Sequence, residues 1–144
     1  MNNSKIREFS FQYLFHLQLP IFEAVKKELS TSKVDLRDSL QEFRSSSEIK
    51  LTGDEFDSAV TQIHTAASNA DELEEKITPF LKNWTLNRIS KVDRTVLLLA
   101  VNEFQYLNTP EKVVINEAVE LAKKYGTEDS PKFVNAVLDN IIKN

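Results

Sequence analysis

The stretch "SKVDRTVLLLAVNEFQYL", residues 90–107, is the most hydrophobic part of the chain and decides its fold. Ser90 and Asp93 have the spacing of a helix capping box, in which the hydroxyl accepts a hydrogen bond from the backbone three residues later. Between residues 96 and 101 the apolar side chains fall on every side of a helix, which is typical of a helix that several others cover. We therefore expect a central helix that ends at residues 108–110, inside a helical bundle.

Two amphipathic helices follow the central helix in this prediction. The apolar stripe of the first consists of Val114, Ile115, Ala118, Val119 and Ala122, and that of the second consists of Phe133, Val134, Val137, Leu138 and Ile141. Between the two helices, Gly126 is expected to adopt the left-handed conformation that commonly follows a helix C-terminus. Ser130 is expected to cap the last helix, with Pro131 at its first position, where a missing N–H is harmless.

The chain before the central helix also has helical periodicity. Ser4 is the expected N-cap of a first helix, which Pro20 ends and whose apolar stripe consists of Ile6, Phe9, Tyr13, Leu14 and Leu17. Phe11 and Phe15 lie off this stripe. The first helix is therefore either buried on two sides or presents part of its aromatic surface to a partner.

The segment between the first helix and the central one predicts further helices and no strand. Residues 21–43 predict one or two short helices with a polar break at residues 30–32, and residues 44–47 predict a loop. Thr52 and Glu55 form a second capping-box pattern, which opens a helix that reaches about Asp71. A further stripe, interrupted by Pro79, consists of Leu73, Ile77, Phe80, Leu81 and Trp84. The predicted fold class is all-α.

The composition narrows the classes of protein that fit the chain. Its 144 residues are the usual size of one domain, and no apolar run approaches the roughly 20 residues of a membrane helix. We therefore expect one soluble, cytoplasmic domain, residues 1–144. The chain has no cysteine and two glycines, which excludes disulfides, thiolate zinc sites and glycine-rich phosphate loops. No cofactor is expected.

The net charge of -4 argues against general binding of polyanions, because proteins of that class are normally basic. The charge is unevenly distributed, since residues 48–76 contain eight acidic residues and two lysines. Any surface that binds nucleic acid is therefore expected outside this segment.

Enzyme chemistry has little support in the sequence. His16 and His64 lie in separate segments without the ligand spacing of a metal site. Glu117 and Glu120 stand three residues apart on a predicted helix, but no partnering base accompanies them, and they fit a solvated face. We expect neither catalysis nor a bound metal ion.

Three segments have a recognisable pattern of residues: "ISKVDRTVLLLAVNEF", residues 89–104, "PEKVVINEAVELAKKYGTEDSPKFVNAVLDNI", residues 110–141, and the shorter "REFSFQYLF", residues 7–15. They resemble the NusB family of bacterial transcription antitermination factors. The resemblance implies about seven helices in two packed sub-bundles, at about residues 1–80 and 81–144. It also implies binding of boxA-type single-stranded RNA together with NusE, a small-subunit ribosomal protein. The resemblance further implies that this binding, in the antitermination complex of RNA polymerase, supports processive transcription of ribosomal RNA operons.

The residues leave two other arrangements open. An exposed helical face for a homodimer looks the same as one for NusE. The chain also has few basic residues near its N-terminus, where members of the family often carry an Arg-rich arm, which implies modest RNA affinity for the isolated protein. The alternative function is a helical protein-interaction scaffold with little or no RNA binding of its own.

Single-stranded RNA is recognised by aromatic faces that stack on bases, polar groups that bind base edges, and cations near phosphates. With the resemblance, this chemistry predicts a set of RNA-binding residues: the aromatic Phe15, Tyr125 and Phe133, the basic Lys5, Arg7, Arg94, Lys123 and Lys132, and the polar Gln12 and Asp129. Tyr125 is expected to be half exposed. Gln12 could instead cap a loop.

Several of these residues have a second interpretation that the sequence leaves open. Phe133 is either a core residue or a stacking face. Asp129 either reads a base, lowers RNA affinity by repulsion, or favours the N-terminus of the last helix through its dipole. Arg94 either contacts RNA or pairs with a carboxylate of its own helix. Lys5 and Arg7 are either RNA contacts or solvated charges.

Overall fold

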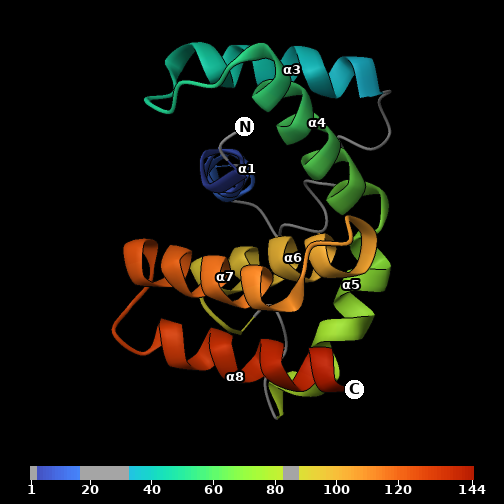
Figure 1. Cartoon of the computed structure of the whole chain (residues 1–144), viewed down its shortest axis with the longest axis vertical. Helices are drawn as coiled ribbons and strands as arrows, with labels where there is room; N and C mark the ends of the chain where they lie inside the picture. Colours follow the sequence, from blue (N-terminus) through green and yellow to red (C-terminus); the bar gives the residue numbers. More distant parts are fainter. Residues whose placement is uncertain (1–2, 17–32, 83–87) are drawn as a thin grey trace. The chain divides into compact units, whose positions relative to one another are not determined.

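The computed structural model describes residues 3–16, 33–82 and 88–144 (Figure 1). Its elements are α1 Asn3–His16, α3 Lys33–Ser46, α4 Gly53–Ser68, α5 Ala70–Ile77, the 3-10 helix η1 Thr78–Leu81, α6 Lys91–Tyr106, α7 Glu111–Tyr125 and α8 Ser130–Lys143. No strand occurs in these ranges, so the all-α prediction is confirmed. The predictions for Leu17, Pro20, residues 30–32 and Trp84 fall outside the described residues.

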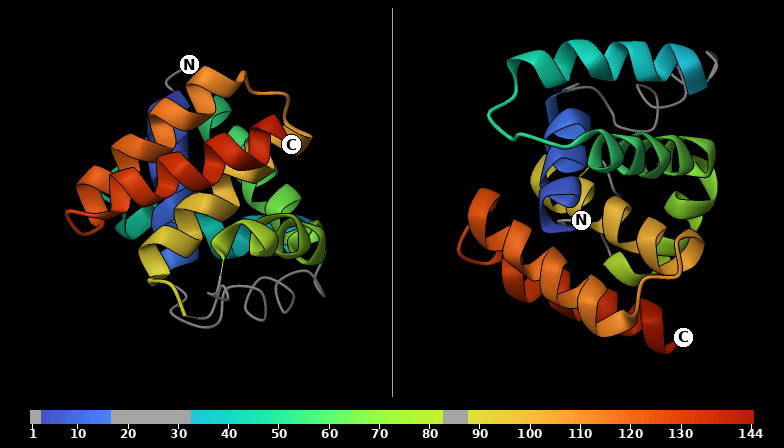
Figure 2. Two further views of the ribbon diagram at one scale, coloured as in Figure 1. Left: turned by 90° about the horizontal axis from the view of Figure 1, so that it is seen from below. Right: turned by 45° about the horizontal axis from the view of Figure 1, so that its top comes forward.

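The chain divides into two compact units, Met1–Ala70 and Asp71–Asn144. In the first unit, α4 contacts both α1 and α3. In the second unit, α6, α7 and α8 contact one another, and η1 contacts α8. Figures 1 and 2 show α7 and α8 side by side and antiparallel, with the turn at residues 126–129 between them.

Aromatic rings fill the core of the first unit. Phe9 is fully buried and meets Phe43 and Phe56 edge to face, with ring centroids 5.5 and 6.2 Å apart. Tyr13 meets Phe43 in the same geometry at 5.5 Å, and its hydroxyl lies 3.1 Å from Ser39 Oγ. Edge-to-face pairs stabilise a core beyond their buried area. These contacts join α1 to α3 and α4 and fix the rotation of α1 about its own axis.

The helix α6 is the central helix that the sequence predicts. Every side chain from Val96 to Val101 is at most 4% exposed, as expected of a helix covered on all sides. The helix also ends as predicted, with Leu107 as its C-cap and Asn108 next, at a φ of 55°. Asn tolerates this left-handed conformation better than most residues do. Thr109 N then donates a hydrogen bond to Glu103 O at 3.1 Å, which closes the helix end.

The two predicted capping boxes form to different extents. At α4, Glu55 N donates to Thr52 Oγ1 at 3.1 Å, and Thr52 N donates to Glu55 Oε1 at 2.9 Å, so both bonds of the box are present. At α6, Asp93 N donates to Ser90 Oγ at 3.0 Å, but Asp93 Oδ1 is buried without a hydrogen-bond partner among the described residues. Asp lacks the extra methylene with which Glu55 reaches back.

The loop predicted for residues 44–47 is wrong for its first three residues, because α3 continues to Ser46. The hydroxyls of Ser45 and Ser46 donate to backbone carbonyls three residues earlier, at 2.7 and 3.1 Å. Serine side chains that bond to their own preceding turn are compatible with the end of a helix as well as with a loop. The helix α1 likewise begins at Asn3, so Ser4 lies in its first turn and not at the N-cap.

Gly126 follows α7, but the left-handed conformation predicted for it is wrong. Its φ and ψ are -95° and -165°, in the extended region, and its N–H donates to Ala122 O at 2.9 Å. The need for glycine comes from space, because an added Cβ would lie 2.4 Å from Ser130 Oγ and 2.8 Å from Ala122 O. The α7–α8 turn is therefore too tight at this position for any side chain.

The helix α8 begins at Ser130, so the prediction that Ser130 is the N-cap is wrong by one position. Asp129 precedes the helix and makes no capping hydrogen bond with its side chain. Ser130 is 1% exposed, and its Oγ accepts a hydrogen bond from Thr127 N at 3.0 Å, so it closes the turn before the helix. Pro131 stays in the first turn, where a missing N–H breaks no helical bond.

Candidate nucleic-acid interface

One face of α1 carries three of the predicted RNA-binding residues. Lys5, Gln12 and Phe15 stand seven and three residues apart, so they lie in line along the helix, and all three are half-buried. Glu8 falls on the same line. Lys5 Nζ is 3.9 Å from Glu55 Oε1, the carboxylate that closes the capping box of α4. The line therefore combines a cation, an amide and an aromatic ring over about three helix turns.

The aromatic end of this line is held by a ring stack. Phe15 stacks on Phe11 with centroids 5.6 Å apart and an angle of 13° between the ring planes. Phe11 is 1% exposed, whereas Phe15 is half-buried. Of the two aromatics off the apolar stripe, Phe11 is therefore a core residue, and Phe15 keeps part of its surface accessible. A ring fixed in this way is a suitable platform for a base, because little side-chain entropy remains to be lost.

Two predicted cations are inside the protein. Arg7 is 6% exposed and Arg94 is 4% exposed. Burial lowers the pKa of Arg94 below its ordinary value, although an arginine stays protonated at neutral pH. A guanidinium that is almost fully covered reaches a phosphate only if its side chain leaves its place. Both residues are thus better placed to support the fold around the candidate surface than to bind RNA directly.

Asp129 and Phe133 line one pocket of the second unit. The pocket has a volume of about 270 Å³, and its lining residues are Arg88, Ile89, Ser90, Asp93, Thr127, Asp129, Ser130 and Phe133. They come from the segment before α6 and its first turn, and from the α7–α8 turn with the first turn of α8. The local reason is the close turn at Gly126, which holds Asp129 beside the N-terminus of α8.

The structure limits the interpretations left open for these two residues. Phe133 is half-buried, so it is neither a fully covered core residue nor a freely exposed one. Asp129 is exposed and makes no side-chain cap to α8. Its proximity to the helix N-terminus remains compatible with a favourable dipole interaction. A base stacked on Phe133 would bring its edge near the Asp129 carboxylate in the same pocket.

Five polar residues of this pocket were not among the predicted RNA-binding residues: Arg88, Ser90, Asp93, Thr127 and Ser130. The pattern of Ser90 and Asp93 indicates a helix start, and that explanation accounts for both residues without a ligand. Capping does not explain why Asp93 Oδ1 is buried without a hydrogen-bond partner among the described residues. This feature of the pocket can be seen only in the structure.

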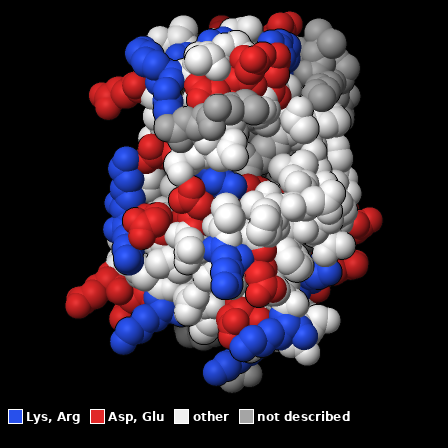
Figure 3. Space-filling view, in the orientation of Figure 1, with Lys and Arg blue, Asp and Glu red and all other residues white. Residues whose placement is uncertain are grey.

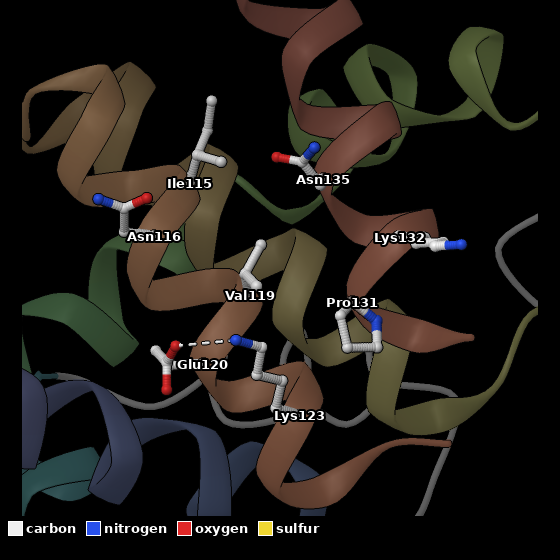
Figure 4. A pocket seen from close by; sticks show the side chains of 8 residues that line it. All are labelled: Ile115, Asn116, Val119, Glu120, Lys123, Pro131, Lys132 and Asn135. Atoms are coloured by element: carbon white, nitrogen blue, oxygen red, sulfur yellow. Dashed lines mark hydrogen bonds and ion pairs between the residues drawn. The ribbon is translucent and has the colours of Figure 1, made fainter. Parts of the chain in front are cut away.

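Lys123 and Lys132 line a different hollow, a groove between α7 and α8 of about 600 Å³. Figure 4 shows the groove with Ile115 and Val119 from α7 and Pro131 and Asn135 from α8 between the two helices. Lys123 Nζ is 3.5 Å from Glu120 Oε1. The groove shares no lining residue with the pocket that contains Phe133.

Tyr125 lines neither the described pocket nor the described groove. It is half-buried, as expected, and Lys124 Nζ lies 5.6 Å from the centroid of its ring. A cation over an aromatic face is a favourable contact, and it leaves at most the other face of the ring for a base.

The charges on the face shown in Figure 3 are mixed, with basic and acidic side chains interspersed. This arrangement fits a chain of net charge -4 and differs from the continuous basic patch of a general polyanion binder. In the described ranges, no group of three or more His, Cys, Asp or Glu side chains could hold a metal ion. No helix in those ranges is long and apolar enough to cross a membrane.

The sequence matches the model of the NusB family over residues 4–143. The chain belongs to the NusB family. Among its relatives, the transcription antitermination protein NusB of Clostridium tetani is 41% identical over 152 residues, which cover 99% of both chains. NusB of Clostridium novyi is 34% identical over 144 residues, again covering 99% of both. The family predicted from three sequence segments is therefore confirmed over almost the whole chain.

Solved NusB structures share the fold. A crystal form of T. maritima NusB has a TM-score of 0.80 and 32% sequence identity, with 100% of this chain and 92% of that chain covered. A crystal structure of the antitermination factors NusB and NusE in complex with dsRNA has a TM-score of 0.73 and 25% identity, with 98% and 96% covered. The second structure shows a NusB-family chain of this fold bound to both a protein and an RNA.

Proposed function

We propose that this protein is a transcription antitermination factor that binds boxA-type single-stranded RNA together with the ribosomal protein NusE. In this role it acts with RNA polymerase to support processive transcription of ribosomal RNA operons. The observation that carries the proposal is the match to the NusB family over residues 4–143. Full-length relatives that are named transcription antitermination proteins support it, as does the neighbour solved with NusE and RNA.

RNA contacts are proposed at two places. On α1, Phe15 offers a stacking face, Gln12 a base-edge group and Lys5 a cation. In the second unit, Phe133 offers a stacking face and Asp129 an acceptor for a base amino or imino group. Each stacked base contributes about 1–3 kcal/mol to binding, so two or three stacks outweigh the weak charge attraction of a protein with net charge -4.

The other residues predicted to contact RNA are not expected to contribute equally to RNA binding. We assign Arg7 and Arg94 a supporting role, because both are buried. Tyr125 stays a predicted contact whose ring already faces Lys124. Lys123 and Lys132 could approach phosphates but lie on the α7–α8 groove.

The rest of the proposal concerns the whole chain. Residues 1–144 form one RNA-binding domain that works in the cytoplasm, without catalytic activity and without a cofactor. Glu117 and Glu120 do not act as a catalytic pair, and Glu120 instead pairs with Lys123 on the surface of α7.

A titration tests the RNA proposal. The full chain, labelled for NMR, is titrated with boxA-type single-stranded RNA and with an RNA of the same composition in scrambled order, each with and without NusE. We expect preference for the boxA-type RNA, stronger when NusE is present, with shifts at Phe15, Asp129 and Phe133. Equal binding of the two RNAs in both conditions contradicts the proposal.

A second candidate function is a helical protein-interaction scaffold with little or no RNA binding. It is favoured by the burial of Arg7 and Arg94, which removes two of the predicted cations from the surface. This function predicts that NusE binds with the same affinity whether boxA-type RNA is present or absent. If the protein is an antitermination factor, NusE and boxA-type RNA should each raise its affinity for the other. Two ligands that favour the same state of a protein act on one another in this way.

A further inference from the structure

The groove between α7 and α8 is not used by the proposed stacking contacts. It arises because the facing side chains of α8, Pro131 and Asn135, are short, while Ile115 and Val119 of α7 are only half-buried. Elsewhere the two helices pack closely through buried residues such as Ala122 and Val134. An open volume of about 600 Å³ between otherwise close-packed helices is large enough for several side chains of a partner.

The lining of the groove differs along its length. Ile115 and Val119 stand four residues apart on α7 and give one end an apolar floor (Figure 4). Lys123 and Lys132 lie at the other end, at the last turn of α7 and the first turn of α8.

This second end is electropositive because its lysines outnumber its acidic residue. The lining contains two lysines and one acidic residue, Glu120, and Lys123 keeps 60% of its side chain exposed. The N-terminus of α8 also lies beside Lys132, but the Asp129 carboxylate at the same helix end offsets its dipole. Figure 4 shows Lys123 turned towards Glu120 and Lys132 pointing away from α7, so two acidic side chains, one for each lysine, are needed to contact both. A carboxylate beside Lys123 would replace its loose pair with Glu120 by a second charge-assisted contact.

The lining contains no aromatic residue, so the groove has no stacking platform for a nucleic-acid base. The combination of apolar floor and cationic end instead fits an amphipathic helix, which places apolar residues at intervals of three and four in a groove. A second copy of this chain fits less well. Its acidic helix α5 buries its own apolar residues Leu73 and Ile77 and has none to insert.

We propose that the α7–α8 groove docks a short amphipathic helix of a partner protein, with its apolar residues on Ile115 and Val119 and its acidic end on Lys123 and Lys132. This surface is separate from the pocket of Phe133, so RNA and such a partner bind at the same time. Lys123 and Lys132 then serve protein recognition and not phosphate binding.

The test uses the full chain and a synthetic helical peptide with leucines at positions i and i+4 followed by two glutamates. Its counterpart has lysines in place of the glutamates. We expect the acidic peptide to shift the resonances of Ile115, Val119 and Asn135 and to bind about tenfold more tightly than the basic one. The double variant Lys123→Glu with Lys132→Glu should lose about tenfold in affinity for the acidic peptide and reverse the preference.

The matched control is Lys143→Glu, a reversal of an exposed lysine on the same helix but outside the groove, which pairs with Asp139 at 3.0 Å. It should leave peptide binding unchanged. Variants are first compared by thermal unfolding, and Val119→Glu, which blocks the apolar floor, gives a second route to loss of binding.

Three results overturn the proposal. The first is equal affinity for both peptides, or shifts outside the groove. The second is a boxA-type RNA that shifts Ile115 and Val119 more than Phe133, which assigns the groove to RNA. The third is self-association of the protein that Val119→Glu removes, which assigns the groove to a second copy. The peptide measurements are made without RNA, so the proposal can fail while the antitermination function stands, and the reverse.

Discussion

At the end of α7, an added methyl group at Gly126 would lie 2.6 Å from Ser130 Cβ, well inside contact distance. We predict that Gly126→Ala lowers the free energy of unfolding by about 1–3 kcal/mol, the usual cost of overpacking. Because Ser130 is buried at the start of α8, the turn has to open to relieve the contact. Urea unfolding of the full chain measures the loss.

Gly53 is the matched control for this prediction. It has no atom within 4 Å of an added Cβ, and its φ is not positive. Gly53→Ala should therefore raise the free energy of unfolding by about 0.4–1 kcal/mol, because alanine loses less backbone entropy on folding. Equal effects of the two substitutions would contradict the explanation from space.

The contributions of Phe133 to protein stability and to RNA binding can be measured separately. Since it is half-buried, Phe133→Ala should cost less than the roughly 3–5 kcal/mol lost at a fully buried Phe. It should also weaken boxA-type RNA binding by about 1–3 kcal/mol, the value of one base stack. Thermal unfolding and an RNA titration of the same variant give the two numbers.

Phe104→Ala is the control for Phe133→Ala, because Phe104 is also half-buried and belongs to the same unit but does not line the pocket. It should lower stability without changing RNA affinity. If both variants bind RNA like the original chain, Phe133 is a packing residue only.

At the scale of helices, the sequence predicts those features that depend on near neighbours. The capping box of Thr52 and Glu55 and the buried helix α6 are confirmed, because each depends on spacing along one helix. The loop at residues 44–47 and the left-handed Gly126 are wrong. One depends on hydroxyls that bond back to the helix, and the other on space taken by a residue of the next helix.

For the candidate site, too, the sequence predicts what depends on spacing along one helix and misses what depends on packing between helices. The sequence identifies aromatic and charged residues of suitable type, and α1 aligns Lys5, Gln12 and Phe15 on one face as helical spacing requires. It does not reveal the burial of Arg7 and Arg94, because charged residues are normally exposed and only packing between elements covers them. It also does not separate Lys132 from Phe133, which adjoin in sequence and line different hollows.

The link between α5 and α6 gives a pH-dependent prediction. Tyr106 Oη donates a hydrogen bond to the Glu72 carboxylate, and this bond, with smaller contributions from burial and from the Glu72 charge, raises the pKa of Tyr106 from 10.0 to about 12. The folded protein therefore holds the phenol proton where the unfolded chain has lost it. The stability from this bond is present below pH 10 and is lost as the pH rises towards 12.

Two variants test this link. Glu72→Gln should lower the Tyr106 pKa towards its ordinary value, measured from the ring resonances in a pH titration. Tyr106→Phe should remove the part of the stability loss that occurs between pH 10 and about 12. If the pH dependence of unfolding in that range is the same for Tyr106→Phe and the original chain, the hydrogen bond has no thermodynamic weight.

For the molecule as a whole, the net charge of -4 predicts how RNA binding responds to salt. If about three phosphates are contacted, the logarithm of the binding constant should fall with the logarithm of salt concentration at a slope of about -2. Isothermal titrations at several salt concentrations measure it. A slope steeper than about -5 would require about seven phosphate contacts, more than the five basic residues predicted to bind RNA could make, and would contradict recognition mainly by stacking.

The first turn of α8 ties two surfaces to one another. Pro131 and Lys132 belong to the groove, while Ser130 and Phe133 belong to the pocket, all within four consecutive residues. An insertion or deletion in this turn would rotate the whole helix and misplace both surfaces at once. Either surface can therefore change in evolution by substitution, while the length of this turn stays constant. An insertion or deletion here is expected only in relatives that use neither the groove nor the pocket.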